Sequence, residues 1–441
     1  MNLLNRVSKI GIIGGGIGGL FLTSSIVRFW DNYPDIYIFD PRFDERGPAR
    51  TSRTSGLVYQ GWGGSYGIPH VDPSIIAHKI DTITFHKEDQ QVHVPDPLGR
   101  KICIINRNPV WRDGQLIPSM YQHIQRYISQ HDRIHFFPFT VDDIVFPQGS
   151  NNRFIILCTD HDGKIHQEAV DGVVFTTLPP KMKETLSKTI RYRPPQTLPG
   201  AIFDVSLETG TWLPEYQALH KFFVGGGQIH TIDLIPRPDM LTVMTLGKGA
   251  TLRRLYRSIE KNPHIQRYLP DKWRTCVIEG SARDLSVPIS PAKNVVADGL
   301  AGLGGQAFGE FLINGGLYSN LWAAELLAKA LKKSGFRKQG LERTYSARVM
   351  KALRFQNFIG KSLYLLSDRF ILPSSRVSSL FLQRIIAEKE LSPEKRLLMR
   401  FAWDILIGEE PFSRVLVRLL QGFAGKTSRP VASEWRPGHT N

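Results

Sequence analysis

Hydrophobic positions near the start of the chain follow first a strand pattern and then a helical one. Lys9–Ile13 is a short apolar run that predicts a buried strand, and helical spacing follows it to about Phe29. Ile36–Phe39 is a second apolar run, and it ends at Asp40. Residues 41–70 are rich in Gly, Ser and Arg, which predicts a long loop region. The chain therefore opens with a strand, a helix and a second strand.

The middle of the chain alternates in the way that antiparallel sheets require. Pro118–Ile128 has helical spacing, and Arg153–Cys158 and Val173–Thr176 predict strands around a turn at "DHDG". Between Gly200 and Gly249 the pattern mostly alternates, with "FFVGGGQIHTIDLI" and "MLTVMTLG" as candidate strands. We expect these segments to form an antiparallel sheet.

The last third of the chain is mostly helical in its spacing. Val295–Val296 predicts another strand, followed by a glycine-rich loop and a helix from about Gly316 to Lys333. Helical spacing then continues nearly to Ala424, and residues 425–441 are predicted to be disordered.

Composition narrows the class of protein. The chain has 441 residues, of which 41% are hydrophobic and 22% charged, as in soluble globular proteins with one large or two medium domains. No apolar run approaches the ~18 residues of a membrane-spanning helix, and Met1–Val7 is too short and polar for a signal peptide. Cys103, Cys158 and Cys276 are isolated, which argues against a disulfide framework or a metal site. We expect buried thiols and a cytoplasmic protein.

Charge is unevenly distributed along the chain. The formal net charge is +16, and from Lys332 onward there are 21 Lys and Arg residues against 9 Asp and Glu residues. A basic surface favours anionic partners such as lipid head groups, nucleic acid or an acidic protein. The alternative interpretation is a solvated helical face without a partner.

One basic segment near the end has a clear apolar face. The segment "SRVLVRLLQGFA" at 413–424 predicts an amphipathic helix with Arg414 and Arg418 near its apolar side. The residues of that side are Val415, Leu416, Leu419, Leu420 and Phe423. Such a helix either lies on an anionic membrane, as a peripheral protein would, or packs on the body of the protein.

A glycine motif supplies the first functional prediction. Gly14-x-Gly16-x-x-Gly19 follows a strand and opens a helix, and Asp40 ends the next strand 21 residues after Gly19. In dinucleotide sites the first glycine makes the tight turn, the second lets the backbone approach a pyrophosphate, and the third allows close helix packing. The acid at the end of the second strand accepts ribose hydroxyls. The predicted contacts are Gly14, Gly15, Gly16, Ile17, Gly19, Asp40 and Arg42. The alternative is a glycine-rich turn that only packs against a helix.

A distant segment helps to distinguish NAD from FAD. An NAD dehydrogenase would continue as a doubly wound sheet, whereas this chain enters the long loop after Asp40. Residues 294–331 read as a strand, Asp298, a glycine-rich loop and a helix. With this pair of segments the sequence resembles the FAD-dependent oxidoreductases with the glutathione-reductase-type dinucleotide fold. That family includes aromatic hydroxylases of the p-hydroxybenzoate hydroxylase type and geranylgeranyl reductases.

The resemblance implies a fold class and further contacts. It implies an α/β protein with a Rossmann-like FAD/NAD(P)-binding domain of the GR2 type, an inserted antiparallel β-sheet substrate domain and a helical C-terminal extension. In that family a late strand ends in an Asp that meets the FAD ribityl chain, and the loop and helix after it face the pyrophosphate and the flavin O2 edge. Ala297-Asp298 and the loop from Gly302 to Gly316 match that region. The contacts implied by the resemblance are Arg53, Thr54, Ser55, Arg112, Asp298, Gly304, Gly305 and Gly315.

The same resemblance divides the chain into domains. The predicted FAD-binding domain comprises 1–60, 101–180 and 285–335, and the predicted substrate domain comprises 61–100 and 181–284. A helical basic region covers 336–424, and 425–441 is the tail.

Acid–base candidates are few. His70, His220 and His230 lie in segments expected to form a substrate pocket, where aromatic residues and glycines alternate, and a histidine exchanges protons near neutral pH. Arg112 stands where the family has an Arg near the flavin. The catalytic candidates are therefore His70, His230 and Arg112, although a single strand histidine is commonly a satisfied core or surface residue.

The predicted activity is that of an FAD-dependent oxidoreductase, a monooxygenase or a reductase, acting on a small hydrophobic substrate. Hydroxylation, oxidation and double-bond reduction all remain open, with NAD(P)H as the expected electron donor. One alternative is an amine-oxidase-like or desaturase-like flavoprotein oxidase. Another is a flavin-binding protein that associates with nucleic acid or a membrane without catalysis, and of these two partners an anionic membrane is favoured over nucleic acid.

Overall fold

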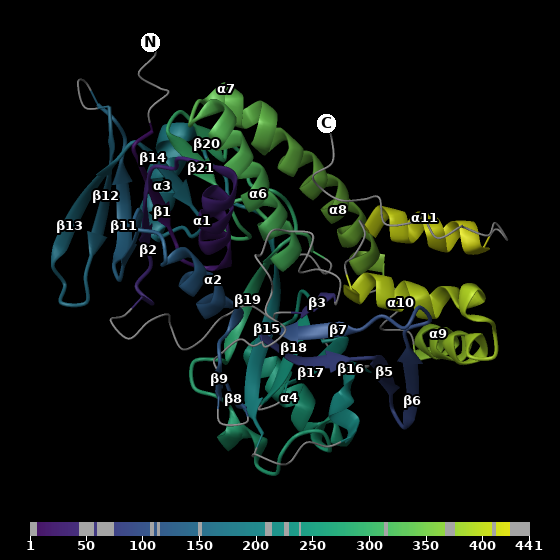
Figure 1. Ribbon diagram of the computed structural model, residues 1–441. Coiled ribbons are helices and arrows are strands. Elements are labelled where there is room, and N and C mark those ends of the chain that lie inside the picture. The colour runs from purple at the N-terminus through teal and green to yellow at the C-terminus, as the bar shows by residue number, and fades with distance from the viewer. Residues whose placement is uncertain are drawn as a thin grey trace.

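The computed structural model describes residues 7–43, 57–59, 75–105, 110–112, 115–148, 152–207, 214–224, 229–237, 240–312, 316–366, 375–407 and 412–423. Most of the predicted loop 41–70 and all of the predicted tail 425–441 lie outside these residues. The described residues form a body around a mostly parallel sheet, a body around an antiparallel sheet, and a set of C-terminal helices (Figure 1).

The first body is built on a six-stranded sheet in the order β10-β2-β1-β14-β21-β20. Its neighbouring strands pair in parallel, except that β20 is antiparallel to β21. The strands are β1 (Lys9–Ile13), β2 (Asp35–Phe39), β10 (Ile134–Phe137), β14 (Gly172–Phe175), β20 (Val296–Ala297) and β21 (Leu300–Gly302). The predicted first two strands and the helix between them are confirmed, because continuous apolar runs are typical of parallel strands buried on both faces.

Helices and a small sheet cover the parallel strands. Helices α1 (Ile17–Phe29), α2 (Met120–Ile128) and α6 (Gly316–Ser334) pack together beside the sheet. On another side of β1, Ile156 and Val170 lie against Gly11. These two residues belong to an antiparallel sheet of β11 (Thr140–Val145), β12 (Phe154–Thr159) and β13 (Ile165–Val170). The "DHDG" turn joins β12 to β13, and β14 then returns the chain to the centre of the parallel sheet beside β1.

The second body is built on a seven-stranded sheet in the order β19-β15-β18-β17-β16-β5-β6. Neighbouring strands are antiparallel, except that β16 and β5 pair in parallel. The strands are β5 (Thr82–Lys87), β6 (Gln90–Pro95), β15 (Thr197–Ser206), β16 (Ala218–Phe223), β17 (Thr231–Arg237), β18 (Met240–Leu246) and β19 (Arg283–Pro288). The predicted antiparallel sheet between Gly200 and Gly249 is therefore confirmed.

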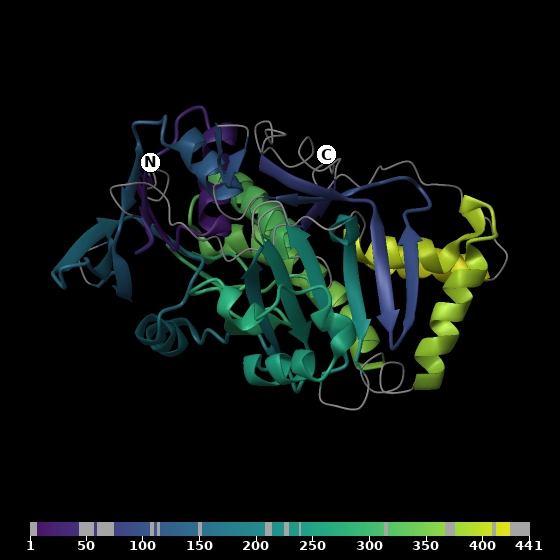
Figure 2. The ribbon, with the colours of Figure 1, turned by 90° about the horizontal axis from the view of Figure 1, so that it is seen from below.

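Shorter elements complete this body. They are β3 (Leu57–Tyr59), β4 (Ile76–Ile80), β7 (Ile102–Ile105), β8 (Val110–Arg112), β9 (Gln115–Ile117), η4 (Pro214–Gln217), α4 (Leu252–Glu260), α5 (Pro263–Gln266) and η5 (Trp273–Cys276). Helix α3 (Pro180–Ile190) instead packs on β11 of the first body, with Met182 and Leu186 in its core. Strand β7 pairs with β3 and β4, and β19 pairs with β15. The domain boundaries expected from the sequence put β7 in the FAD-binding domain and divide β19 between residues 284 and 285, whereas both strands belong to sheets of the second body. Viewed from below, the two bodies lie side by side (Figure 2).

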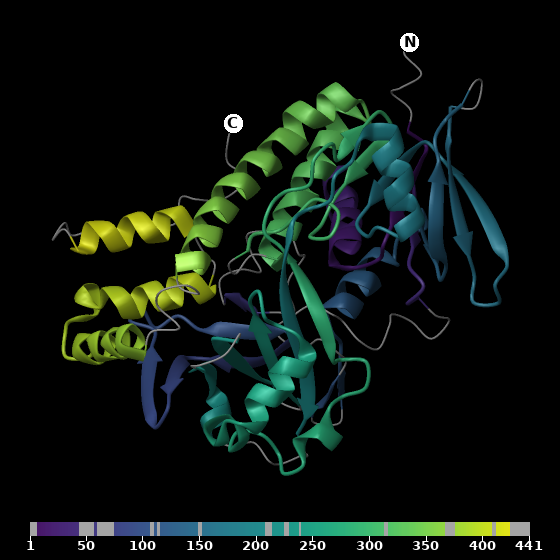
Figure 3. The same ribbon diagram turned by 180° about the vertical axis from the view of Figure 1, so that it is seen from behind.

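The C-terminal helices extend from one body to the other. They are α7 (Lys338–Leu341), η6 (Glu342–Ser346), α8 (Ala347–Leu366), α9 (Ser375–Glu388), η8 (Pro393–Lys395), α10 (Leu397–Ile407) and α11 (Phe412–Phe423). Helix α8 begins near α6 and runs toward α10 and α11, as Figure 3 shows from behind. Trp403 of α10 is fully buried and donates from Nε1 to the Val94 carbonyl at 2.8 Å. No helix of the described residues is long and apolar enough to cross a membrane.

The predicted amphipathic helix forms as α11, and one side of it packs on the protein. Val415 is buried, and Arg418 forms an ion pair with Asp404 of α10 at 2.9 Å. Val417 and Leu420 are 51% and 58% exposed. One side of α11 thus packs on the protein, while part of its apolar surface remains in solvent.

Candidate functional site

The glycines of the turn after β1 differ in whether the fold leaves space for a side chain at their position. Gly14 has φ +98°, and a Cβ there would collide with the Thr176 hydroxyl. A Cβ on Gly19 would collide with the carbonyl oxygen of Gly14. A Cβ on Gly16, by contrast, would meet only Nη2 of Arg42, at 3.6 Å. The protein's own packing therefore requires Gly14 and Gly19 but not Gly16, whose missing side chain leaves space above the turn.

The N-terminus of α1 has features that favour the binding of a negatively charged group. Its N-cap is Gly16, no side chain caps the helix, and its first turn has no acidic residue. The first N–H groups of a helix have no partner within the helix, and they carry a partial positive charge. This open helix start after a tight glycine turn is the geometry that binds phosphate groups.

Asp40 holds the turn and an arginine together. The Asp40 side chain is only 5% exposed, and its Oδ2 accepts a hydrogen bond from the backbone N–H of Gly15 at 2.8 Å. Arg42 donates to Asp40 from its backbone N, from Nε at 2.8 Å and from Nη2 at 2.6 Å. A carboxylate has about four acceptor positions, and these four bonds use them. Asp40 therefore fixes the Arg42 guanidinium beside Gly16, while the sequence had assigned it to ribose hydroxyls.

The hydrogen bonds from Asp40 also stabilise the charge on Arg42. They raise the pKa of the Arg42 guanidinium, against the effect of burial, so it stays protonated. Tyr121 of α2 donates from its hydroxyl to the Gly15 carbonyl and closes the turn from the other side. Tyr121 is buried, which raises the pKa of its phenol.

A second glycine segment from the far end of the chain lies against the first. A Cβ on Gly18 would stand 3.8 Å from Leu303 Cγ and 3.9 Å from Gly304 Cα. Thr176, just after β14, donates from Oγ1 to the Gly14 carbonyl at 3.0 Å. The Thr176 carbonyl in turn lies 3.7 Å from where a Cβ on Gly304 would be, and Gly304 has φ +94°. The loop after β21 and the loop after β1 thus meet at the carboxyl end of the parallel strands.

Asp298, which the sequence analysis predicted as a cofactor contact, lies away from the place where the two glycine segments meet. Asp298 and Gly299 form the two-residue turn between β20 and β21, and Gly299 has φ +77°. This turn is at the amino end of β21, whereas the glycine segments meet beyond Gly302 at its carboxyl end. Asp298 Oδ1 instead accepts from the backbone N–H of Lys338 at the start of α7, at 2.7 Å. An Asp-Gly pair between apolar residues is a strong hairpin signal, and this signal was present in the sequence.

Two side chains that the sequence analysis missed lie in this second loop. Glu310 is partly buried, and its Oε2 is 2.5 Å and 2.9 Å from where Cβ atoms on Gly305 and Gly316 would be. Asn320 of α6 is 9% exposed, and its Oδ1 is buried without a hydrogen-bond partner among the described residues. Asn320 Oδ1 lies 3.6 Å from where a Cβ on Gly304 would be. Glu310 is the only charged residue between Asp298 and Glu325, which was the available signal.

Helix α8 holds this loop from behind. Asn357 is 2% exposed, its Nδ2 donates to the Glu310 carbonyl at 2.9 Å, and its Oδ1 accepts from the Leu312 N–H at 2.9 Å. Tyr345, which precedes α8, donates from its hydroxyl to the Gly302 carbonyl at 2.7 Å. The loop's conformation therefore depends on residues of the C-terminal region.

The remaining predicted site residues stand as follows. Arg53, Thr54, Ser55, His70 and Gly315 lie outside the described residues. Arg112 ends β8, and only its backbone is described.

Of the two candidate histidines in the second body, His220 lies in the core and His230 lies at one end of the sheet. His220 is 2% exposed and bonds through Nδ1 to His86 Nε2 at 2.9 Å, so it belongs to the core of the seven-stranded sheet. His230 directly precedes β17. Thr231 contacts Thr245 at the end of β18, next to Leu246, which pairs with Gly200 near the start of β15.

The sheet end that carries His230 is connected to the second glycine loop through β15 and the segment after β19. Ile289, just after β19, bonds to Gln196 before β15, and Ala292 bonds to the carbonyl of Phe308. This path links the start of β15 directly to the loop after β21. His230 therefore lies at the end of the antiparallel sheet that faces the first body.

Comparison with known proteins gives a likeness of fold. No family model matches the sequence, and no curated protein is similar to it. Among solved structures, a geranylgeranyl bacteriochlorophyll reductase-like protein from Thermoplasma acidophilum is similar, with a TM-score of 0.62 and 14% identity over 94% of this chain and 98% of that one. The p-nitrophenol 4-monooxygenase of Pseudomonas putida has a TM-score of 0.60 and 12% identity over 91% and 98% of the two chains. A flavoprotein/dehydrogenase from Cytophaga hutchinsonii has a TM-score of 0.58 and 11% identity over 96% and 100%. The chain therefore has the mixed α/β fold that these flavoproteins share, over nearly its whole length.

Proposed function

Starting from this shared fold, we propose that the protein is an FAD-dependent oxidoreductase of the monooxygenase or reductase type. The observation that carries the proposal is the meeting of the two glycine segments, after β1 and after β21, at the carboxyl end of the parallel sheet. Open α/β sheets bind dinucleotides at that end. The solved structures that are similar to this chain include a monooxygenase, an oxygenase, a flavin-dependent brominase and a reductase-like protein.

The residues present fit a dinucleotide. The space above Gly16 and the uncapped start of α1 suit a pyrophosphate, and the Arg42 guanidinium beside them supplies a fixed positive charge. The buried Asn320 Oδ1 offers an acceptor to a donor group of the ligand. When bound, a flavin supplies the redox chemistry, and the chain's task is to bind it, orient it and exclude water.

The substrate site belongs, in this proposal, to the end of the antiparallel sheet that faces the second glycine loop. His230 is at that end, and the buried apolar strands β15, β17 and β18 lead away from it. Such surroundings suit a small hydrophobic organic substrate, with one histidine able to exchange a proton. NAD(P)H is the proposed electron donor. A flavoprotein oxidase that uses oxygen or a quinone as acceptor is the alternative.

The visible spectrum of the purified protein tests the cofactor. We expect absorption maxima of oxidised flavin, or binding of added FAD that quenches its fluorescence. Anaerobic bleaching by NADH or NADPH then distinguishes a reductase or monooxygenase from an oxidase. A folded protein that is colourless and does not bind FAD contradicts the proposal.

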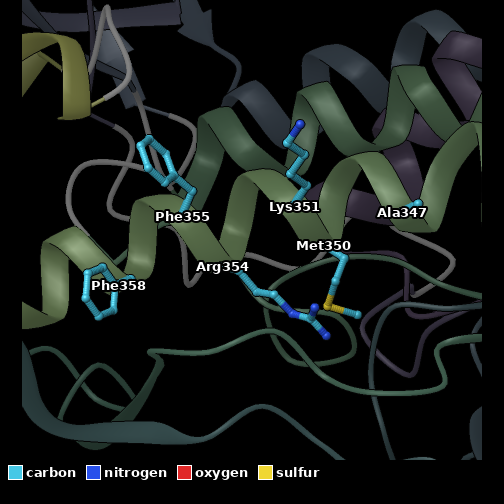
Figure 4. Close-up of a pocket in the computed structure, with 6 residues that line it drawn as sticks. All are labelled: Ala347, Met350, Lys351, Arg354, Phe355 and Phe358. Carbon is cyan, nitrogen blue, oxygen red and sulfur yellow. The ribbon is translucent and has the colours of Figure 1, made fainter.

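We also propose that the C-terminal region binds an anionic membrane surface. Helix α8 contains four basic residues and no acidic one. Phe355 and Phe358 on its outer side are 54% and 72% exposed, and Lys351 and Arg354 lie beside them around a shallow hollow, which Figure 4 shows. Exposed aromatic rings among basic side chains suit insertion at the head-group level of an anionic bilayer.

A further inference from the structure

The side chain of Glu310 occupies an unusual position in the second glycine loop. Its Oε2 lies close to the Cα atoms of Gly305 and Gly316, so that a side chain on either glycine would have to displace it. Gly316 is the first residue of α6, a helix of 19 residues whose start carries a partial positive charge. The carboxyl group therefore lies between the loop and the helix start.

The backbone around Glu310 is fixed. Asn357 of α8 binds the Glu310 carbonyl and the Leu312 N–H at 2.9 Å each, and Phe311 N–H lies 3.4 Å from the Ser319 hydroxyl. These bonds hold both sides of Glu310 but leave its carboxyl group without a hydrogen-bond donor among the described residues. Burial disfavours the charged form of this carboxyl and outweighs the attraction of the helix start.

The Glu310 carboxyl consequently changes its charge near neutral pH. Burial raises the pKa of Glu310 to about 7, and no charged group of the described residues contributes to that shift. The Glu310 side chain lies beside Gly305 and beside Gly316 at the start of α6. Asn357 of α8 binds the backbone carbonyl of Glu310. The protonation of Glu310 therefore follows the solution pH in the range where most enzymes work.

A second, independent feature indicates that a ligand belongs here. Asn320 is on the second turn of α6, 91% buried, and its Oδ1 has no partner among the described residues. That atom faces Gly304, on the same side of the loop that adjoins Gly18 of the first glycine turn. Buried amide oxygens are nearly always hydrogen-bonded, so a donor from a bound molecule is the expected partner.

We propose that Glu310 is the group whose charge would control the affinity of a bound flavin for electrons, because its carboxyl lies between the second glycine loop and the start of α6, where the flavin would be held. The inference rests on the proposed function, since it requires a flavin between the two glycine segments. Reduction adds negative charge to the ring. A protonated Glu310 tolerates that charge, whereas an ionised Glu310 opposes it. In this proposal Glu310 acts on the flavin through its charge, and it forms no bond to the substrate.

The test compares the wild-type protein with Glu310→Gln, which has nearly the same shape but no titrating group. In each, the ratio of the affinities for reduced and oxidised FAD is measured from pH 5.5 to pH 9 by titration against a redox dye. The two proteins should agree at pH 5.5, where Glu310 is protonated. Above pH 8 the ratio should be about tenfold lower in the wild-type protein, as for a pKa shift of about one unit upon reduction.

Two further variants complete the design. Glu342→Gln removes an equally charged but 51% exposed side chain of η6, and it should follow the wild-type curve at every pH. Glu310→Asp keeps a titrating carboxyl, so its affinity ratio should still fall as the pH rises. This result tests the inference without Glu310→Gln if the glutamine variant folds poorly.

The possible outcomes separate the two proposals. If the wild-type protein binds FAD but the wild-type and Glu310→Gln curves run parallel over the whole pH range, Glu310 does not act on the flavin and only this inference fails. If the folded wild-type protein does not bind FAD, the proposed function fails and this inference fails with it.

Discussion

At the scale of single residues, the glycines of the first turn have different physical roles. Gly14 adopts a backbone conformation that side chains disfavour, and Gly19 lies in contact with the Gly14 carbonyl. Both are needed by the folded chain itself. Gly16 has open space where its side chain would be, so its identity matters only if another molecule comes close.

This difference makes a paired prediction. Gly16→Val should leave the fold intact but remove at least about 90% of FAD retention, because its side chain blocks the approach of the phosphates to the helix start. Gly19→Ala should instead destabilise the protein by about 1–3 kcal/mol, since the added methyl group overlaps the Gly14 carbonyl. Flavin absorbance per protein and the melting temperature measure the two effects. Full flavin occupancy in folded Gly16→Val would disprove the assignment of this site.

The sequence was sufficient for the first half of the site but not for the second. The glycine turn, Asp40 and Arg42 lie within one strand–helix–strand unit, where local spacing determines geometry. The position of Asp298 was not predictable, because a short strand pair, β20 and β21, reverses the chain where a single strand was expected. Glu310 and Asn320 each come to lie against glycines of the second loop only through the packing of α6 on that loop, and spacing along the chain does not predict such contacts.

At the scale of elements, the parallel pairing of β5 with β16 buries two histidines together. His86 and His220 are each 2% exposed and hydrogen-bonded at 2.9 Å, and the His86 ring stacks on Phe222 with centroids 4.1 Å apart. Burial, and next the neighbouring His220, lowers the pKa of His86 to about 3. The antiparallel pattern of this region was predictable, but the pairing of segments more than 130 residues apart was not.

The buried pair makes stability sensitive to acid. The pKa of His86 is depressed in the folded protein, so its contribution to stability is fully present above pH 6.5 and is lost as the pH falls from 6.5 toward 3. Over that range the pair should contribute a slope of about 1.4 kcal/mol per pH unit to the free energy of unfolding. His86→Phe keeps a ring for stacking on Phe222 and should flatten that slope in urea unfolding curves recorded between pH 4 and pH 7.

A surface histidine provides the comparison. His161, which is exposed in the turn between β12 and β13, should leave the slope unchanged when replaced by Gln. Equal slopes in the wild-type protein and His86→Phe would exclude the buried pair as the source of acid sensitivity.

At the scale of the whole molecule, the C-terminal helices give the protein a basic side with exposed apolar groups. Composition predicted the basic charge of this region, and periodicity predicted its helices. Neither placed the exposed phenylalanines, because Phe355 and Phe358 become a surface feature only once the opposite side of α8 is packed against the loop after β21.

The proposed membrane surface has a direct test. The wild-type protein should float with vesicles that contain phosphatidylserine, and binding should weaken in 0.5 M salt because screening reduces attraction to anionic lipids. Replacing both Phe355 and Phe358 by Ser should reduce binding about tenfold or more, as two inserted rings are lost. Ile165→Ser removes a side chain that is 71% exposed on β13 and should have no effect. Equal flotation of the double variant would locate the interface elsewhere.

Helix α8 also determines which parts of this protein can be exchanged. Its Asn357 secures two backbone groups of the loop beside the first glycine turn, and Tyr345 just before it secures Gly302. A chimera that takes its C-terminal third from a distant homologue would keep every glycine of the motif and still lose the loop's scaffold. We therefore expect that a substitution of Asn357 or Tyr345 changes the conformation of the loop even though neither residue belongs to it.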